Sequence, residues 1–501
     1  MFVVEKTTNE VRRDMNILPL KDLTFKDIER KFYELGCEIA KNMMQQFLEH
    51  ADEELAKNRN KSQLRHKGKK TTTIKTLMGE VVFRRNIYKK VTEDGQVQHI
   101  YLLDKALGFE SIGTISPNLA EKIIELSCHK SYRQVAQTIK ELTNQTISHQ
   151  AVWDIIQTVG QRQREAEKQL IKAFQDNELC GDREVSVLFE ESDGLWLSMQ
   201  GKSRPKRGKG RKELKIGIAY EGWEPRYPSS KEYRTVGKTV FAGYHQAEHF
   251  QELREATIAA KYNMDKIKHR ILNGDGASWI RYDHEPETGI FQLDPYHLSK
   301  NIIKNVKDKK ARHHIQRWLK AGEFHKVYAK IEELKYQCGG LADEIKKLID
   351  LESYIKNNQD GIISYKDRKE IKIPSPPEGL EYRNLGTMEK NVDIFAKRMK
   401  GGKSWSEEGA TNLAKIIALK MGENFKDKIA ALISGQVSDR LTERFEEAIT
   451  NTRKTLDKTI IKKIYPLHRG QIPFSNCKMT NGRRVIRNLF NMQDFCELTY
   501  R

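Results

Sequence analysis

The sequence feature that most constrains the fold is residues 185–200, VSVLFEESDGLWLSMQ, because this stretch places an acid inside a buried strand. Apolar residues alternate up to Phe189, a polar trio interrupts them, and the alternation resumes at Leu195, as expected of a central strand. A carboxylate at Asp193 costs free energy in such a place unless it binds a cation. The stretch therefore predicts a central strand built around a functional acid.

The segments that follow predict a sheet domain. Residues 213–222 and 235–244 have the pattern of two further antiparallel strands, and residues 246–266 have that of an amphipathic helix. Two short apolar strands come next and end in the acids Asp275 and Asp294. Three strands, a helix and then strand ends with acids is the order of a ribonuclease-H-like core. We therefore expect an α+β multidomain chain with such a mixed sheet at its core.

A third acid is expected from Glu389. It leads an apolar stripe at residues 392, 395, 396 and 399 on the same helical face, which points its side chain toward the sheet. A glutamate placed favourably in the first turn of a helix is the alternative explanation. Glu381, Glu407 and Glu408 are rival third acids.

The charge balance favours a polyanionic partner. Lys and Arg number 89 against 69 Asp and Glu, which leaves a net charge of +20. Such a balance favours double-stranded DNA, although a merely soluble basic protein would also carry it. No apolar run approaches the roughly 18 residues of a membrane span. The six scattered cysteines predict reduced, mostly core residues and not zinc ligands, so we expect a cytoplasmic protein without membrane contact.

Residues 131–157 have the pattern of a helix-turn-helix. Leu142 belongs to the apolar face of the first helix, and Ser148 caps the second. Trp153 is expected in the protein core. Plain packing of three helices would give the same pattern. Side chains that would be left to read base edges or phosphates are Arg133, His149 and Gln150.

A second DNA-binding candidate is the loop GKSRPKRGKGRK between the first two predicted strands of the sheet domain. It is too polar and too flexible to pack, and it would draw DNA phosphates toward the acid on the neighbouring strand. A solvated loop is the alternative explanation. Its seven cations are Lys202, Arg204, Lys206, Arg207, Lys209, Arg211 and Lys212.

Charge and periodicity also predict domain boundaries. Residues 1–60 form a helical arm for packing or dimerisation, residues 61–110 a basic β-hairpin region, and residues 111–180 the helix-turn-helix with a linker helix. The catalytic core occupies residues 181–297 and 379–405, and residues 298–378 form a helical insertion between these parts. Residues 406–501 form a basic helical region without a decisive motif.

Four motifs in order, ESDGLWL, NGDGASWI, LDPYHLSKN and MEKNVDIFAKRMKGGKSWS, resemble bacterial insertion-sequence transposases of the ISLre type, relatives of the Mutator-like transposases. The resemblance extends over essentially the whole chain. It implies a DDE transposase whose acids are Asp193, Asp275 and Glu389. Asp294 and His297 correspond to the C/D-x-x-H motif of the relatives, although Asp-Pro also suits the start of a helix.

The resemblance further implies that the enzyme acts on the terminal inverted repeats of its own element and on target DNA, as a dimer or larger oligomer, in a bacterial cytoplasm near the nucleoid. Three carboxylates suit this chemistry because oxygen ligands select two Mg²⁺ or Mn²⁺ ions, which activate water and stabilise a leaving oxygen. Two alternatives stay open at this point. One is a non-catalytic DNA-binding protein derived from a transposase, and the other is a nuclease of the same fold without strand transfer.

Overall fold

The computed structural model describes residues 24–91, 95–107, 115–206, 208–281, 289–339 and 341–433. These residues separate into two compact units, residues 24–74 with 78–107 and residues 75–77 with 115–433. Each unit has its own hydrophobic core. Among the helices of these residues, none is both long and apolar enough to cross a membrane.

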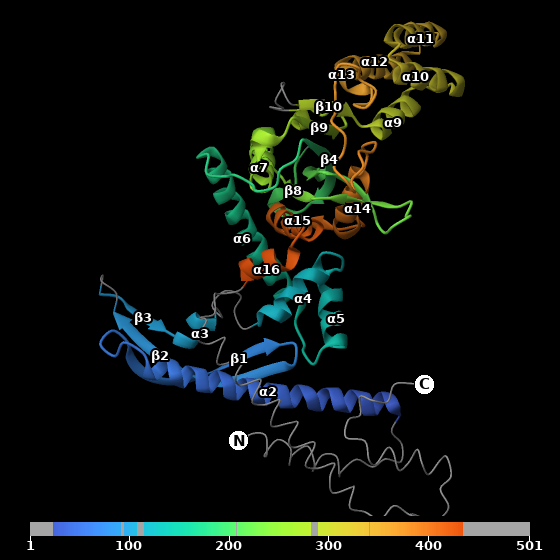
Figure 1. Ribbon diagram of the computed structural model, residues 1–501. Coiled ribbons are helices and arrows are strands. Elements are labelled where there is room, and N and C mark those ends of the chain that lie inside the picture. Colours follow the sequence, from blue (N-terminus) through green and yellow to red (C-terminus); the bar gives the residue numbers. More distant parts are fainter. Residues whose placement is uncertain are drawn as a thin grey trace, which may run out of the picture. The chain divides into compact units, whose positions relative to one another are not determined.

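The first unit consists of a long helix and a small sheet (Figure 1). The helix α2 (Phe25–Lys57) begins at a capping box in which Thr24 accepts a hydrogen bond from the backbone N–H of Asp27. Its second half packs on strands β1 (Arg65–Thr76) and β2 (Gly79–Val91), which confirms the predicted helix and hairpin. The strand β3 (Val97–Ile100) and helix α3 (Leu102–Leu107) were not predicted. Arg85 forms an ion pair with Asp104, so this cation has a structural partner.

The second unit begins with three packed helices, α4 (Pro117–Ser127), α5 (Tyr132–Leu142) and α6 (His149–Gln175). Ser148 caps α6 as predicted, because its hydroxyl accepts a hydrogen bond from the N–H of Ala151. Two expectations were wrong. Leu142 is 71% exposed, and the predicted linker helix is the continuation of α6 rather than a separate element.

A mixed sheet follows, with β4 (Val187–Met199) at its centre (Figure 1). The strand order is β10 (Gly289–Leu293), β9 (His269–Gly274), β4, β5 (Arg211–Tyr220) and β8 (Thr239–Gly243). β9 is parallel to both β4 and β10, whereas β5 is antiparallel to both β4 and β8. The short strand β11 (Ser404–Trp405) also pairs with β4. A separate ribbon consists of β6 (Gly222–Pro225) and β7 (Tyr233–Val236).

Helices cover both faces of the sheet. On one face, Phe189, Ile216 and Ile218 share a buried core with α14 (Met388–Met399) and α15 (Glu407–Met421). On the other face, Leu272 packs with residues of α7 (Ala247–Ala259). The small helices α8 (Ser278–Arg281) and α16 (Phe425–Ile433) lie at the margins of these cores. Residues 187–192 of β4 are therefore buried on both faces, and a charged side chain there needs a partner.

A helical segment separates β10 from α14, as the sequence predicted. It consists of α9 (Pro295–Asn305), α10 (Lys309–Ala321), α11 (Phe324–Gln337), α12 (Ala342–Asn357) and α13 (Gln359–Ile362). Ile302, Ile315 and Leu348 join its helices into a core with β9 and β10. The left-handed residue Gly322 ends α10, at one of the predicted breaks. Among the residues that the structure describes, no disulfide joins two cysteines. Cys37 and Cys128 are buried, whereas Cys180 is exposed.

Candidate active site

Three aspartates lie on three neighbouring parallel strands, Asp193 in the middle of β4 and Asp275 and Asp294 directly after the ends of β9 and β10. The strand register aligns Glu191 of β4 with Asn273 of β9, and Asn273 with Gln292 of β10. Because side chains alternate along a strand, residues two positions further on lie on the same face. Those residues are Asp193, Asp275 and Asp294. We call this group the acidic edge.

Electrostatic effects link these aspartates. Burial raises the pKa of Asp193, and the negative charges of Asp275 and Asp294 raise it further. His297 and the backbone N–H of Gly194 act in the opposite direction, and this N–H donates to Asp193 Oδ1 at 2.7 Å. A cation that neutralises all three acids at once would stabilise the ionised form of Asp193 most strongly.

Asp294 and His297 form a pair at the start of α9. Asp294 caps the helix, because its Oδ1 accepts a hydrogen bond from the N–H of Tyr296 at 3.1 Å. Its Oδ2 lies 2.6 Å from His297 Nδ1. This hydrogen bond raises the pKa of His297, burial lowers it, and the charges of Asp193, Asp294 and Asp275 raise it again, with a net increase. The pair thus combines the structural cap with an electrostatic connection to Asp193.

The turn after β9 holds Asp275. Its Oδ1 accepts a hydrogen bond from the N–H of Ala277 at 2.9 Å, and its carbonyl accepts one from the hydroxyl of Tyr354 on α12 at 2.8 Å. Gly276 has a φ of +89°, and a Cβ there would lie 2.4 Å from Oδ1 of Asn358. The turn therefore requires glycine, and the helical segment helps to fix the position of Asp275.

Glu213 on β5 is a fourth acid near this edge, and the sequence analysis did not select it. Burial raises its pKa, and so do the charges of Asp275 and Asp193, while Lys215 lowers it. Its side chain extends over Gly194, where a Cβ would lie 2.0 Å from Glu213 Oε1. No signal in the sequence pointed to Glu213, because the register aligns Gly194 with Lys215 and Glu213 with Trp196.

The structure places Glu389 in the first turn of α14, where it is exposed. Its side chain is exposed rather than buried against the sheet, and its role as third acid stays a prediction. Two rivals have other partners. Glu407 pairs with Lys212 at 2.5 Å, and Glu381 pairs with Arg383 at 2.9 Å. Glu408 is exposed in the first turn of α15.

The oxygen donors at this edge suit a hard divalent cation. Carboxylates select Mg²⁺ or Mn²⁺, and Mg²⁺ keeps several waters, so a pair such as Asp193 and Asp275 suffices when DNA phosphate supplies further oxygens. Across the residues that the structure describes, no three His, Cys, Asp or Glu side chains lie close enough together to hold a metal on their own. The oxygen donors of these acids therefore fit the chemistry of a hard divalent cation.

The DNA-binding candidates lie on the surface. Arg133, His149 and Gln150 are exposed on α5 and α6, as predicted. Trp153 was expected in the core, but it is 39% exposed and lies beside them on the outer face of α6. The exposed surface of α6 therefore offers an aromatic ring as well as polar groups.

In the basic loop between β4 and β5, the exposed cations are Lys202, Arg204, Lys206, Lys209 and Arg211. Lys212 is half-buried and pairs with Glu407. Arg207 lies outside the described residues.

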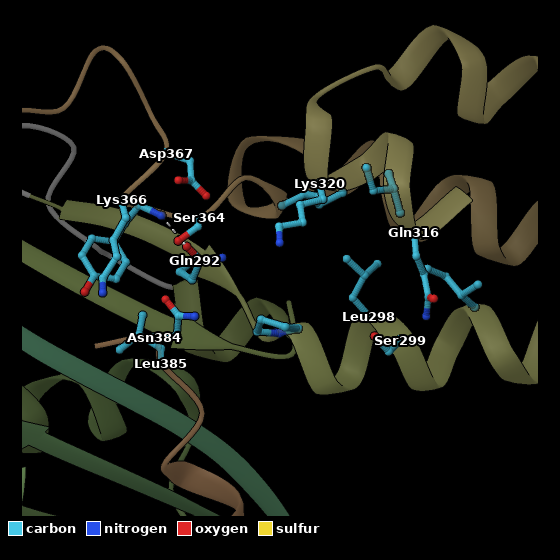
Figure 2. Close-up of a pocket in the computed structure, with 15 residues that line it drawn as sticks. Gln292, Leu298, Ser299, Gln316, Lys320, Ser364, Lys366, Asp367, Asn384 and Leu385 are labelled. Atoms are coloured by element: carbon cyan, nitrogen blue, oxygen red, sulfur yellow. Dashed lines mark hydrogen bonds between the residues drawn. The ribbon is translucent and has the colours of Figure 1, made fainter. Parts of the chain in front are cut away.

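A cavity of about 610 Å³ lies beside the acidic edge, between α9, α10 and the segments before α14 (Figure 2). Leu298 and Ser299 of α9 line one side, and Lys366 and Asp367 line the other. Gln292, two residues before Asp294, lies in its wall and accepts a hydrogen bond from the N–H of Tyr365 at 2.8 Å. The cavity is thus built on the strand end that carries Asp294.

Fold and site together define a mixed α+β protein with an acidic edge on a helix-covered sheet. The chain belongs to UPF0236, an uncharacterised protein family whose profile matches residues 20–462. It is similar to the UPF0236 protein in the vanSb 3′ region of Streptococcus gallolyticus, with 24% identity over 409 residues, which cover 80% of this chain and 84% of that protein. Among solved structures, a pre-cleavage Mos1 transpososome matches 49% of this chain and 79% of its own, with 11% identity and a TM-score of 0.14, too low to support an argument.

Proposed function

We propose that the protein is a DDE transposase that cleaves DNA at the terminal inverted repeats of its own insertion sequence and transfers the strand to target DNA, with two Mg²⁺ or Mn²⁺ ions. The observation that carries this proposal is the set of aspartates on β4 and at the ends of β9 and β10, where burial and the charges of Asp275 and Asp294 raise the pKa of Asp193. Carboxylates held close together at a partly dry edge are costly unless they bind cations.

The sheet supports a ribonuclease-H-like core. β4, β5 and β8 are neighbouring antiparallel strands of the sheet, with the β6–β7 ribbon inserted between β5 and β8. α7 follows β8, and β9 and β10 then add in parallel on the other side of β4. The helical segment α9–α13 precedes α14, which carries Glu389. This is the order inferred from the sequence, and it agrees with the transposase-like motifs found there.

In the proposed reaction, Asp193 and Asp275 hold the cations, and Glu389 completes the set from α14. The bound cations would activate the attacking water or 3′-hydroxyl and stabilise the leaving oxygen. Asp294 fixes the imidazole of His297 through the 2.6 Å hydrogen bond. This hydrogen bond raises the pKa of His297, and in its protonated form the imidazole would offer positive charge beside Asp193 to a phosphate. The exposed loop cations and the surface of α6 would hold the duplex, and the protein would act as a dimer that pairs two DNA ends.

The test is nicking of a labelled terminal repeat in the presence of Mg²⁺. We expect Asp193→Ala and Asp275→Ala to lower the nicking rate at least about 100-fold, because each removes a cation ligand. Asp265→Ala removes an exposed acid outside the edge and serves as the control. Full activity of both ligand variants would refute the proposal. Joined products distinguish a transposase from a nuclease without strand transfer.

The third acid needs a separate comparison, because Asp294 is adjacent to Asp275 in the register whereas Glu389 comes from a helix. Loss of nicking in Glu389→Ala with activity retained in Asp294→Ala would support Glu389. The opposite result would assign the third ligand to Asp294.

A second candidate is a DNA-binding protein without catalysis. The absence of a ready group of three metal-holding side chains among the described residues favours it. It predicts specific binding of the terminal repeat that is unaffected by Mg²⁺ and by Asp193→Ala, with no nicked product.

A further inference from the structure

Glu191 is a buried carboxylate that the proposed chemistry does not use. It has 0% exposure and lies on β4 two residues before Asp193, on the same face. Its two oxygens accept six hydrogen bonds. A buried charge with every acceptor site engaged by protein donors is a built site with a defined geometry.

The first group of donors holds α14. The N–H groups of Gly386, Thr387 and Met388 donate to Glu191 at 3.0, 3.1 and 3.3 Å, and the hydroxyl of Thr387 donates at 2.5 Å. Thr387 is the N-cap residue of α14, yet its own side chain does not cap the helix. Glu191 takes that role from a different element, and its negative charge also suits the positive end of the helix dipole.

The remaining donors come from the two strands beside β4. Asn273 Nδ2 on β9 donates to Glu191 Oε2 at 2.9 Å, and the hydroxyl of Tyr220 on β5 donates to Oε1 at 2.6 Å. Three of these positions have a fixed relation to the proposed ligands. Glu191 lies two residues before Asp193, Asn273 lies two residues before Asp275, and Met388 directly precedes Glu389.

We propose that Glu191 is the positioning residue that sets the spacing of Asp193, Asp275 and Glu389, an inference that rests on the proposed function. One carboxylate connects the three elements that carry these acids, each within two residues of the acid itself. Rotation of α14 or sliding of β9 would shift an acid and would at the same time break hydrogen bonds to Glu191, so these hydrogen bonds resist such movements. An amide cannot replace the carboxylate, because its NH₂ group would face the N–H donors.

The decisive pair of variants is Glu191→Gln and Glu190→Gln. Both change a buried acid of β4, but Glu190 points to the opposite face, where it pairs with Arg270 at 2.7 Å. A milder pair is Tyr220→Phe and Tyr262→Phe. The hydroxyl of Tyr262 is also buried and donates to a carboxylate, that of Glu221 at 3.0 Å, and to the carbonyl of Gly237 at 2.7 Å. The milder pair provides the answer if either glutamine variant fails to fold.

The first measurement is the binding of Mn²⁺ alone to the full chain without DNA, followed by electron paramagnetic resonance of free Mn²⁺. We expect Glu191→Gln to weaken Mn²⁺ binding about tenfold or more, because substitutions of residues that position metal ligands have effects of this size. Tyr220→Phe should weaken Mn²⁺ binding by a smaller factor. Glu190→Gln and Tyr262→Phe should lower thermal stability without changing Mn²⁺ affinity. Wild-type Mn²⁺ affinity in folded Glu191→Gln, or in Tyr220→Phe if the former does not fold, would overturn the inference.

The nicking assay separates this inference from the proposed function. If the wild type binds Mn²⁺ but does not nick DNA, the proposed function fails, and the Mn²⁺ affinities alone decide the role of Glu191. If the wild type binds no Mn²⁺, the metal centre and the positioning role are both refuted. If it nicks DNA, the Mg²⁺ concentration for half-maximal rate should rise in Glu191→Gln with unchanged affinity for the terminal repeat.

Discussion

At the scale of single residues, the acidic edge combines groups that burial and neighbouring charge affect in opposite ways. Burial raises the pKa of Asp193, whereas the hydrogen bond to Asp294 raises the pKa of His297 and burial lowers it. An imidazolium next to a row of aspartates partly balances their charge in the metal-free protein. The stability of the metal-free protein should therefore depend on the protonation of His297.

The first prediction concerns pH. The folded pKa of His297 lies above its usual value, so its contribution to stability is complete below about pH 6.5 and is lost as the pH rises through the folded pKa. In metal-free protein, His297→Gln should therefore destabilise the fold more near pH 6 than near pH 9. Denaturant unfolding at both pH values measures this difference. NMR titration should show a lower His297 pKa in Asp294→Asn, and an unchanged pKa would contradict the assignment of its cause.

The sequence predicted residues whose role is visible in the local pattern. It did not predict residues whose role depends on contacts with distant parts of the chain. Asp193, Asp275 and Asp294 were found because each interrupts or ends an apolar run. The roles of Glu191 and Glu213 could not be predicted, because their partners come from other elements. Trp153 was placed in the core on the general hydrophobicity of its ring, but Val152 and Ile156 already fill the inner face of α6.

At the scale of elements, alternation and helical periodicity predicted β4, β5, β9, β10 and α14, since each carries a continuous pattern. The ends of α6 show why other boundaries were missed. A separate linker helix was expected after the helix-turn-helix, but α6 continues through Gly160, where the lack of a side chain allows close packing: a Cβ there would lie 2.4 Å from Cβ of Asn412 on α15. A single sequence does not distinguish a glycine that ends a helix from one that lets another helix approach.

The second prediction follows from this contact. Gly160→Ala should destabilise the second unit by about 1–3 kcal/mol, because the new methyl group also meets the backbone of Asn412. Gly36→Ala in α2 is the matched control, since no atom lies within 4 Å of its Cβ position. That substitution should stabilise α2 by about 0.5–1 kcal/mol. Denaturant unfolding gives both values, and equal signs would contradict the packing argument.

The third prediction concerns the loop between β4 and β5. Replacement of Lys202, Arg204 and Lys206 by Gln should weaken binding of any DNA sequence and flatten its salt dependence. Each lost phosphate contact should lower the slope of log affinity against log salt by about 0.9. Titrations at several salt concentrations measure the slope, with Lys346→Gln on α12 as a control of similar exposure. An unchanged slope would show that the loop is only solvated.

At the scale of the whole molecule, two compact units with separate cores should unfold as two transitions. The fourth prediction is that Mg²⁺ or Mn²⁺ raises only the transition of the unit that contains the acidic edge. At a cation concentration of 100 times the dissociation constant, the gain is about 2.7 kcal/mol. Calorimetry with the cation and with a chelator measures the shift. Asp193→Asn should abolish it, and a shift retained in that variant would place the cation elsewhere.

Because α6 is continuous, its length bears on the distance between the bases that the protein would recognise and the bond that it would cleave. The helix contains 27 residues, with the exposed side chains of His149 and Gln150 in its first turn and contacts to α7 and α15 further along. At 1.5 Å per residue it is a rigid rod of roughly 40 Å. If a duplex binds at the N-terminal end of this helix, the distance between the recognised bases and the acids would be fixed by the helix. The position of the cleaved bond relative to the recognised bases would then be a property of helix length.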